Sequence, residues 1–214
     1  SDGTILGRHF CKFPKEIDCL THSINRIRKA QQNGNQKTPR LWARAKGMNH
    51  DIASKTATAI MDVAILYSAD VIVFEHLDKN GKARGSKKQK LKLWRSQEVQ
   101  SIVTNKAHRL GMRISRICPW GTSKYAYDGS GAVLRGADGG FQTYGLCKFK
   151  NGKTYNCDLS ASYNIGARYF IRGLLKSEPE RVRLQLEAKV PEACKRSTCT
   201  FSTLISLNAV LMSA

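Results

Sequence analysis

Two acidic residues, Glu75 and Asp158, stand where the sequence predicts that secondary-structure elements meet. Glu75 follows the apolar run "VIVF" at 71–74, which is typical of a buried strand. Asp158 lies between a predicted hairpin and a predicted helix. Active sites of open α/β sheets gather at the carboxyl ends of strands, and paired carboxylates suit Mg²⁺ because it takes oxygen ligands. Both residues are therefore candidate ligands of a magnesium ion that assists phosphodiester cleavage.

Each of these carboxylates also has an ordinary structural explanation, and the residues alone leave both explanations open. Glu75 could cap a helix or pair with a lysine, and Asp158 could be the N-cap of the helix that follows it. His76 and His108 are conceivable general bases, but histidines that only pack or face solvent are much commoner than catalytic ones.

The elements around the two carboxylates alternate between helix and strand, and this order predicts an α/β fold. We expect strands at 3–13, 71–74 and 112–118, and helices at 15–30, 50–68, 96–110 and 159–175. Ser96 is the expected N-cap of its helix and Gly111 the residue just past its end. Between Pro119 and Asp158 we expect a small β insert, with Asn151 and Gly152 as the type I′ turn of a hairpin.

The charge of the chain predicts a polyanionic partner. Its 214 residues include 36 Lys and Arg against 16 Asp and Glu, which gives a net charge of +20 and a sequence pI near 9.9. Nucleic acid explains so broad an excess better than a membrane surface does, and charge that only promotes solubility is the alternative. Without a membrane-length apolar run or a signal peptide, we expect a soluble, cytoplasmic protein. The seven cysteines form no regular framework, so we expect most of them to be reduced.

Four segments of the chain, in order, carry a resemblance to a known family. They read "ADVIVFEHLD", "NKAHRLGMRI", "PWGTSKYAYDGSG" and "NCDLSASYNIGARYF". Over roughly residues 1–175 the chain resembles the C-terminal RuvC-like nuclease region of the transposon-encoded TnpB family and of the related type V CRISPR nucleases. The resemblance implies an RNase H-like mixed sheet with flanking helices. It also implies that Glu75 and Asp158 are catalytic carboxylates of a two-Mg²⁺ site.

The chain departs from the family pattern in its ribbon. Ala126 and Gly129 stand where the family has zinc-binding thiolates, and Lys150 stands three residues after Cys147 in place of another. A tetrahedral zinc site needs four such ligands, so we expect no zinc and a metal-free ribbon. We expect Cys118 and Cys157 to be buried as small apolar side chains.

A second departure concerns a third carboxylate. The family's "G-I-D-x-G" segment, which provides the first catalytic Asp on the first strand, does not occur in these residues, and Asp2 lies in a predicted turn. We therefore expect the chain to lack that first strand and to need a missing N-terminal part of the same protein. The chain alone, with Mg²⁺, is expected to cleave DNA negligibly.

The resemblance also implies a domain organisation. The expected parts are a RuvC-like core at 1–118, a degenerate zinc-ribbon-like β insert at 119–157, the final RuvC-like helix at 158–176, and a tail at 177–214. The tail has no chemistry that the sequence assigns, and its apolar end is expected to pack on the domain.

DNA and a guide RNA are the partners that the resemblance implies, and the basic segments supply candidate contacts. Trp94 is available to stack on a base, and the cations could follow a phosphate backbone. The candidate nucleic-acid contacts are Arg40, Arg44, Lys46, Lys82, Arg84, Lys87, Lys88, Lys90, Lys92, Trp94 and Arg95. Three other functions stay open: a nuclease-inactive relative that binds guide RNA and DNA, a decayed transposon-encoded protein, and a DNA-strand-transfer transposase.

Overall fold

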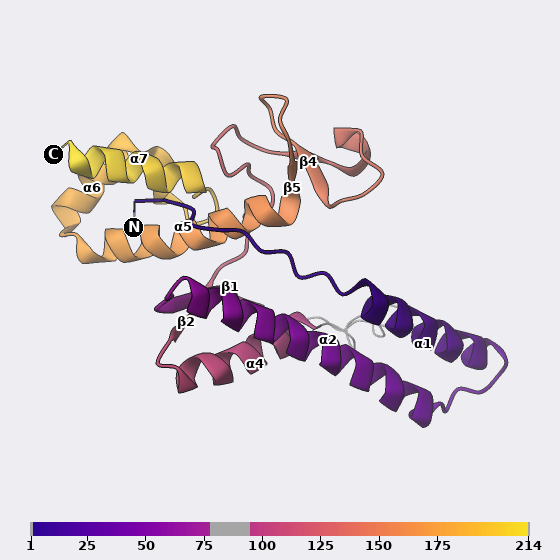
Figure 1. The fold of residues 1–214 in the computed structure, drawn as a ribbon. Helices are drawn as coiled ribbons and strands as arrows, with labels where there is room; N and C mark the ends of the chain where they lie inside the picture. The colour runs from indigo at the N-terminus through magenta and orange to yellow at the C-terminus, as the bar shows by residue number, and fades with distance from the viewer. Residues whose placement is uncertain (1, 78–94, 214) are drawn as a thin grey trace. The chain divides into compact units, whose positions relative to one another are not determined.

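A computed structural model describes residues 2–77 and 95–213 of the chain (Figure 1). The described part is mixed α/β, with six α-helices, one two-stranded sheet and one three-stranded sheet. Its residues divide into two compact units. We call residues 6–72 and 95–114 the helical unit, and residues 2–5, 73–77 and 115–213 the carboxylate unit, because the second contains both Glu75 and Asp158.

Three of the predicted helices form the helical unit: α1 (Pro14–Gln32), α2 (Pro39–Leu66) and α4 (Ser96–Arg109). Both α1 and α2 begin with proline, whose fixed φ suits the first helical turn. Helix α2 begins at Pro39 instead of residue 50, so the Arg-rich segment forms its first turns. The buried residues between α1 and α2 are Leu20, Ile27, Ala45 and Ile52, and small residues of α2 let α4 pack closely on it.

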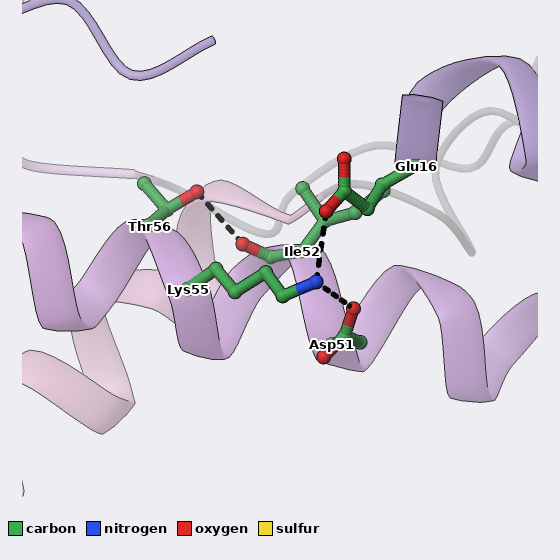
Figure 2. A network of polar contacts seen from close by, with 5 residues as sticks. All are labelled: Glu16, Asp51, Ile52, Lys55 and Thr56. Atoms are coloured by element: carbon green, nitrogen blue, oxygen red, sulfur yellow. Dashed lines mark hydrogen bonds and ion pairs between the residues drawn. The ribbon is translucent and has the colours of Figure 1, made fainter. Parts of the chain in front are cut away.

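A polar network also joins α1 to α2 (Figure 2). The Lys55 Nζ lies 2.8 Å from Glu16 Oε1 and 2.9 Å from Asp51 Oδ2. Hydrogen bonds to these two carboxylates raise the pKa of Lys55 to about 12. Thr56 Oγ1 donates to the Ile52 carbonyl at 2.8 Å, one turn back along α2. The charge of Lys55 is thus matched by acidic partners within the protein.

Strands β1 (Val71–Glu75) and β2 (Arg113–Ile117) pair, with α4 between them in the sequence. The Arg113 N–H donates to the Asp70 carbonyl at 2.8 Å, and the His76 N–H donates to the Ile117 carbonyl at 2.7 Å. Because the strand starts are bonded together and the strand ends likewise, β1 and β2 run parallel. All residues of β1 are half-buried, whereas the apolar run predicted full burial on both faces.

The strand predicted at residues 3–13 is wrong, because the described residues before Pro14 form neither strand nor helix. Leu6 and Phe10, which would lie on the same face of a strand, are 71% and 52% exposed. A strand needs a neighbouring strand and a buried face, and among the described residues this segment pairs with no strand and buries neither face.

The β insert contains a short 3₁₀ helix (Gly136–Gly139) and the antiparallel strands β3 (Leu134–Arg135), β4 (Leu146–Lys148) and β5 (Thr154–Asn156). Its hairpin is confirmed, but the type I′ turn is wrong. Gly152 has a φ of +84°, whereas Asn151 does not have the positive φ that a type I′ turn requires. The Gly152 N–H donates to the Phe149 carbonyl at 3.0 Å, as in a type I turn followed by a glycine bulge.

The last part of the carboxylate unit is helical: α5 (Cys157–Ser177), α6 (Glu180–Lys189), a 3₁₀ turn (Pro191–Cys194) and α7 (Phe201–Met212). The tail packs against α5, as its apolar composition predicted. The buried core between these elements consists of Ala167, Ile171, Leu186, Val190, Ala193, Cys199, Leu204 and Leu207. No helix within 2–77 or 95–213 is long and apolar enough to cross a membrane.

Candidate active site

Glu75 is the last residue of β1, and its side chain is half-buried. The next residue, His76, forms the backbone bond to the Ile117 carbonyl that ends the pairing with β2. Glu75 therefore stands at the carboxyl end of a parallel strand pair, which is where active sites of α/β sheets gather.

Asp158 is the second residue of α5, and it is exposed. The N-cap of this helix is Asn156, whose side-chain Oδ1 accepts the Leu159 N–H at 2.9 Å. The interpretation of Asp158 as the N-cap is therefore wrong. Because Asn156 caps the helix, the carboxylate of Asp158 is not needed as a cap. Asp158 lies in the first turn of α5, where the helix dipole favours negative charge.

The charges of Glu75 and Asp158 influence one another in the structure. Burial raises the pKa of Glu75, and the negative charge of Asp158 raises it further. Ionised Glu75 is thus disfavoured in the absence of a counter-charge. A divalent cation with a preference for oxygen ligands would relieve this repulsion, so the two side chains fit a Mg²⁺ site by their chemistry.

Replacing Glu75 with Gln is expected to stabilise the metal-free protein at pH 7. A carboxyl whose folded-state pKa lies above its ordinary 4.5 destabilises the folded state once it ionises. The gain in the free energy of unfolding should therefore be present at neutral pH. It should disappear as the pH falls below the pKa that Glu75 has in the unfolded state. Thermal unfolding of both proteins between pH 4 and 7 measures it. Asp138→Asn, at an exposed position of the insert, is the matched control and should show no such gain; an equal gain there would contradict this origin.

Helix α5 is held in place by two buried polar residues one turn apart, Asn164 and Arg168. Asn164 Nδ2 donates to the carbonyls of Thr122 at 2.8 Å and Tyr125 at 2.9 Å. Its Oδ1 accepts the Phe201 N–H at 2.9 Å. Asn164 thus fixes the start of the β insert and the start of α7 to the helix that carries Asp158.

Sequence reasoning missed the role of Arg168. Its guanidinium donates to four backbone carbonyls, those of Cys118, Trp120, Ser197 and Cys199. A usable signal was present: Arg168 lies one turn after Asn164 and one turn before Ile171, on the apolar face of the predicted helix. A charged residue on such a face must find polar partners when it is buried.

The two histidines considered as bases are both exposed. His76 follows β1, and His108 lies in the last turn of α4. Within the described ranges, no three His, Cys, Asp or Glu side chains converge as a metal cluster. Of the candidate site residues within the described ranges, Glu75 and Asp158 are linked by the effect of the Asp158 charge on the pKa of Glu75.

The predicted nucleic-acid contacts fall into two groups. Arg40, Arg44 and Lys46 are exposed on the first turns of α2, and Arg95 is half-buried just before α4. Positive charge in the first turn of a helix opposes the helix dipole, so Arg40 does not stabilise α2. The remaining candidates lie outside the described residues: Lys82, Arg84, Lys87, Lys88, Lys90, Lys92 and Trp94.

We call residues 19–50, which join most of α1 to the first turns of α2, the tip of the α1–α2 hairpin. This tip carries more cations than the predicted nucleic-acid contacts included. Between Asp18 and Asp51 the sequence has seven Lys or Arg and no acidic residue. A groove of about 400 Å³ between the helices is lined in part by Arg26 of α1 and Arg44 of α2. Arg26 was missed because the periodicity of α1 marks its apolar face and says nothing of how its polar face is used.

Apolar packing fills the interior of the β insert. Ala126, Cys147, Phe149 and Cys157 form one buried cluster. Burial, reinforced by the adjacent Cys157, raises the pKa of the Cys147 thiol to about 12, which keeps it protonated at neutral pH. Cys157 is buried as predicted, but the prediction for Cys118 is wrong: its side chain is exposed, while its carbonyl is bonded to Arg168.

Comparison with known proteins bears on this arrangement. No protein-family model matches the chain. The chain is 29% identical over 188 residues to a TnpB-like protein of Aquifex aeolicus (strain VF5), an alignment that covers 78% of this chain. This similarity supports a relationship to the TnpB family. The chain spans about 60% of the length of that TnpB-like relative.

The relationship agrees with the resemblance seen in the four sequence segments. The fold of the described residues is mixed α/β, as predicted.

Proposed function

We propose that this TnpB relative forms part of an RNA-guided DNA endonuclease that cleaves phosphodiester bonds by a Mg²⁺-dependent, RuvC-like mechanism. The observation that carries the proposal is the electrostatic pairing of Glu75, at the end of β1, with Asp158, in the first turn of α5. The parallel β1–β2 pair and the mixed α/β composition of the described residues are compatible with an RNase H-like core.

In this proposal Glu75 and Asp158 hold Mg²⁺ from two different elements. Glu75 is half-buried at the end of a strand, whereas Asp158 is exposed and open to a phosphate substrate. When bound, Mg²⁺ in such a site activates water and stabilises the leaving oxygen. A third carboxylate, from sequence that corresponds to the part of the relative not spanned here, would complete the ligand set.

Metal binding by the chain tests this assignment directly. We expect the 214-residue chain to bind Mn²⁺, the paramagnetic substitute for Mg²⁺, and both Glu75→Gln and Asp158→Asn to weaken binding by at least tenfold. Free Mn²⁺ is measured by electron paramagnetic resonance during titration of the protein. Asp138→Asn is the matched carboxylate control. Binding that stays the same in all four proteins would contradict the proposal.

The partners in this proposal are DNA and a guide RNA, with base pairing to the guide supplying sequence specificity. The acid-free tip of the α1–α2 hairpin supports contacts with a phosphate backbone, because its cations have no acidic neighbours in the sequence that would neutralise them. We propose Arg40, Arg44 and Lys46 as such contacts, and the cations and Trp94 of the 82–95 segment as further ones.

The salt dependence of DNA binding tests the hairpin contacts. Each phosphate contact contributes about 0.9 to the slope of log K against log salt. We therefore expect Arg40→Gln, Arg44→Gln and Lys46→Gln, combined, to lower the slope by roughly 2.7. The measurement is fluorescence anisotropy of a labelled duplex across a salt series.

Lys55→Gln is the matched control for this experiment, because Glu16 and Asp51 already neutralise the Lys55 charge (Figure 2). Its slope should equal that of the parent. If Lys55→Gln lowered the slope as much per residue as the hairpin variant does, the contacts would not be specific to the hairpin tip.

A further inference from the structure

Arg168 is a buried cation that the proposed reaction does not use. It is 5% exposed, and within the described residues its hydrogen bonds go to carbonyl groups instead of carboxylates. Burying an arginine is costly unless its donors are satisfied. A well-packed apolar side chain often stabilises a core at least as well as a buried charge does. The position therefore calls for an explanation other than packing.

The carbonyls that Arg168 binds come from two separate segments. Nη1 donates to Cys118 at 2.9 Å and to Trp120 at 2.8 Å, just after β2. Nε and Nη2 donate to Cys199 at 3.0 Å and to Ser197 at 2.9 Å, just before α7. The planar guanidinium has donors in fixed directions, so it can hold both segments in one geometry.

The segment after β2 is directly connected to Glu75. The Ile117 carbonyl accepts the N–H of His76, the neighbour of Glu75, and the next carbonyl, that of Cys118, accepts from Arg168. Arg172, one turn further along α5, donates to Ser115 Oγ of β2 at 2.8 Å. Helix α5 is thus fastened to the strand that pairs with the Glu75 strand.

The same helix carries Asp158 at its other end. Asp158 and Arg168 are ten residues apart on one α-helix, a rise of about 15 Å. An α-helix over this length moves as a rigid element, so the way Arg168 binds the segment after β2 influences where Asp158 lies relative to Glu75.

We propose that Arg168 is a positioning residue for the two carboxylates. Residues 191–207 of the tail complete the set of groups that bind its guanidinium. Carbonyl groups of the tail accept the hydrogen bonds from Arg168 Nε and Nη2. The apolar tail residues Leu204 and Leu207 pack against α5. This assigns a function to the tail: it holds α5 in the orientation that brings Asp158 to Glu75. The inference rests on the proposed metal site.

Arg168→Lys tests the proposal, because lysine keeps the charge but cannot reach two segments with a planar fork. We expect Mn²⁺ affinity to fall by about 10- to 100-fold, the range for groups that orient metal ligands. We also expect hydrogen exchange of the His76 and Leu159 amides, which neighbour the two carboxylates, to become at least tenfold faster. Arg181→Lys, at an exposed position of α6, is the matched control and should change neither quantity.

Two results would overturn the proposal. One is Mn²⁺ affinity in Arg168→Lys equal to that of the parent, whatever happens to the melting temperature. The other is uniform acceleration of amide exchange throughout the carboxylate unit, including α6, because this would show that Arg168 only contributes to global stability.

The proposed metal site can fail separately. If the parent chain shows no Mn²⁺ binding that depends on Glu75, the nuclease assignment fails. The amide exchange then decides the placement of α5: selective acceleration at His76 and Leu159 supports it, and unchanged rates overturn it.

Discussion

Asn164→Leu is expected to lower the free energy of unfolding of the carboxylate unit by about 3 to 5 kcal/mol, since a buried polar group left without its partner costs roughly 1–3 kcal/mol. The side chain of Asn164 is 0% exposed and bonds the Thr122 and Tyr125 carbonyls and the Phe201 N–H. Leucine has nearly the same size but leaves all three groups unpaired. Urea unfolding followed by circular dichroism measures the loss.

Two companion variants make this experiment specific. Gln185→Leu, at an exposed position of α6, introduces the same side chain where no such bonds exist and should be close to neutral. Asn164→Asp keeps an oxygen for the Phe201 N–H but places an acceptor against the two carbonyls, so it should also destabilise strongly. If Asn164→Leu and Gln185→Leu had the same effect, the bonds of Asn164 would contribute nothing measurable.

The helices and strands that flank the candidate site could be predicted from the spacing of apolar residues, because each has a wide apolar face or an apolar run. Helices α1, α4 and α5 and strands β1 and β2 lie where the sequence predicted them, within a few residues. The errors came from segments whose conformation depends on partners elsewhere. Residues 3–13 alternate in the sequence like a strand, but no strand within 2–77 or 95–213 pairs with them. The alternation of residues within one segment does not show whether another strand lies beside it.

The candidate site itself was predictable only in its two carboxylates. Asn156, not Asp158, is the N-cap of α5. Both residue types suit an N-cap, and which of them takes that position depends on where β5 ends and α5 begins. The carbonyls that bind Arg168 lie 29 to 50 residues away from it in sequence, and any residue has a carbonyl. The sequence analysis therefore missed Arg168, and even its place on an apolar face could not have identified its partners.

In a protein that completes the site, Glu75→Gln and Asp158→Asn are each expected to lower Mg²⁺-dependent DNA cleavage by about a thousandfold or more. Each change removes a charged ligand from the proposed metal site, and a loss of about 4 kcal/mol in transition-state stabilisation is a thousandfold in rate. Arg168→Lys should have a smaller effect, since it displaces Asp158 without removing it. Asp138→Asn, outside the site, should cleave like the parent.

The measurement compares plasmid cleavage by two proteins, the 214-residue chain and an N-terminally extended protein that supplies a third carboxylate. We expect negligible cleavage by the chain and robust cleavage by the extended protein with guide RNA, because the proposed ligand set includes a third carboxylate. Robust, Glu75-dependent cleavage by the chain alone would contradict the need for the third. An extended protein that binds guide and target with the expected salt dependence but does not cut would favour a nuclease-inactive relative, and Glu75 and Asp158 would then be remnants of a metal site.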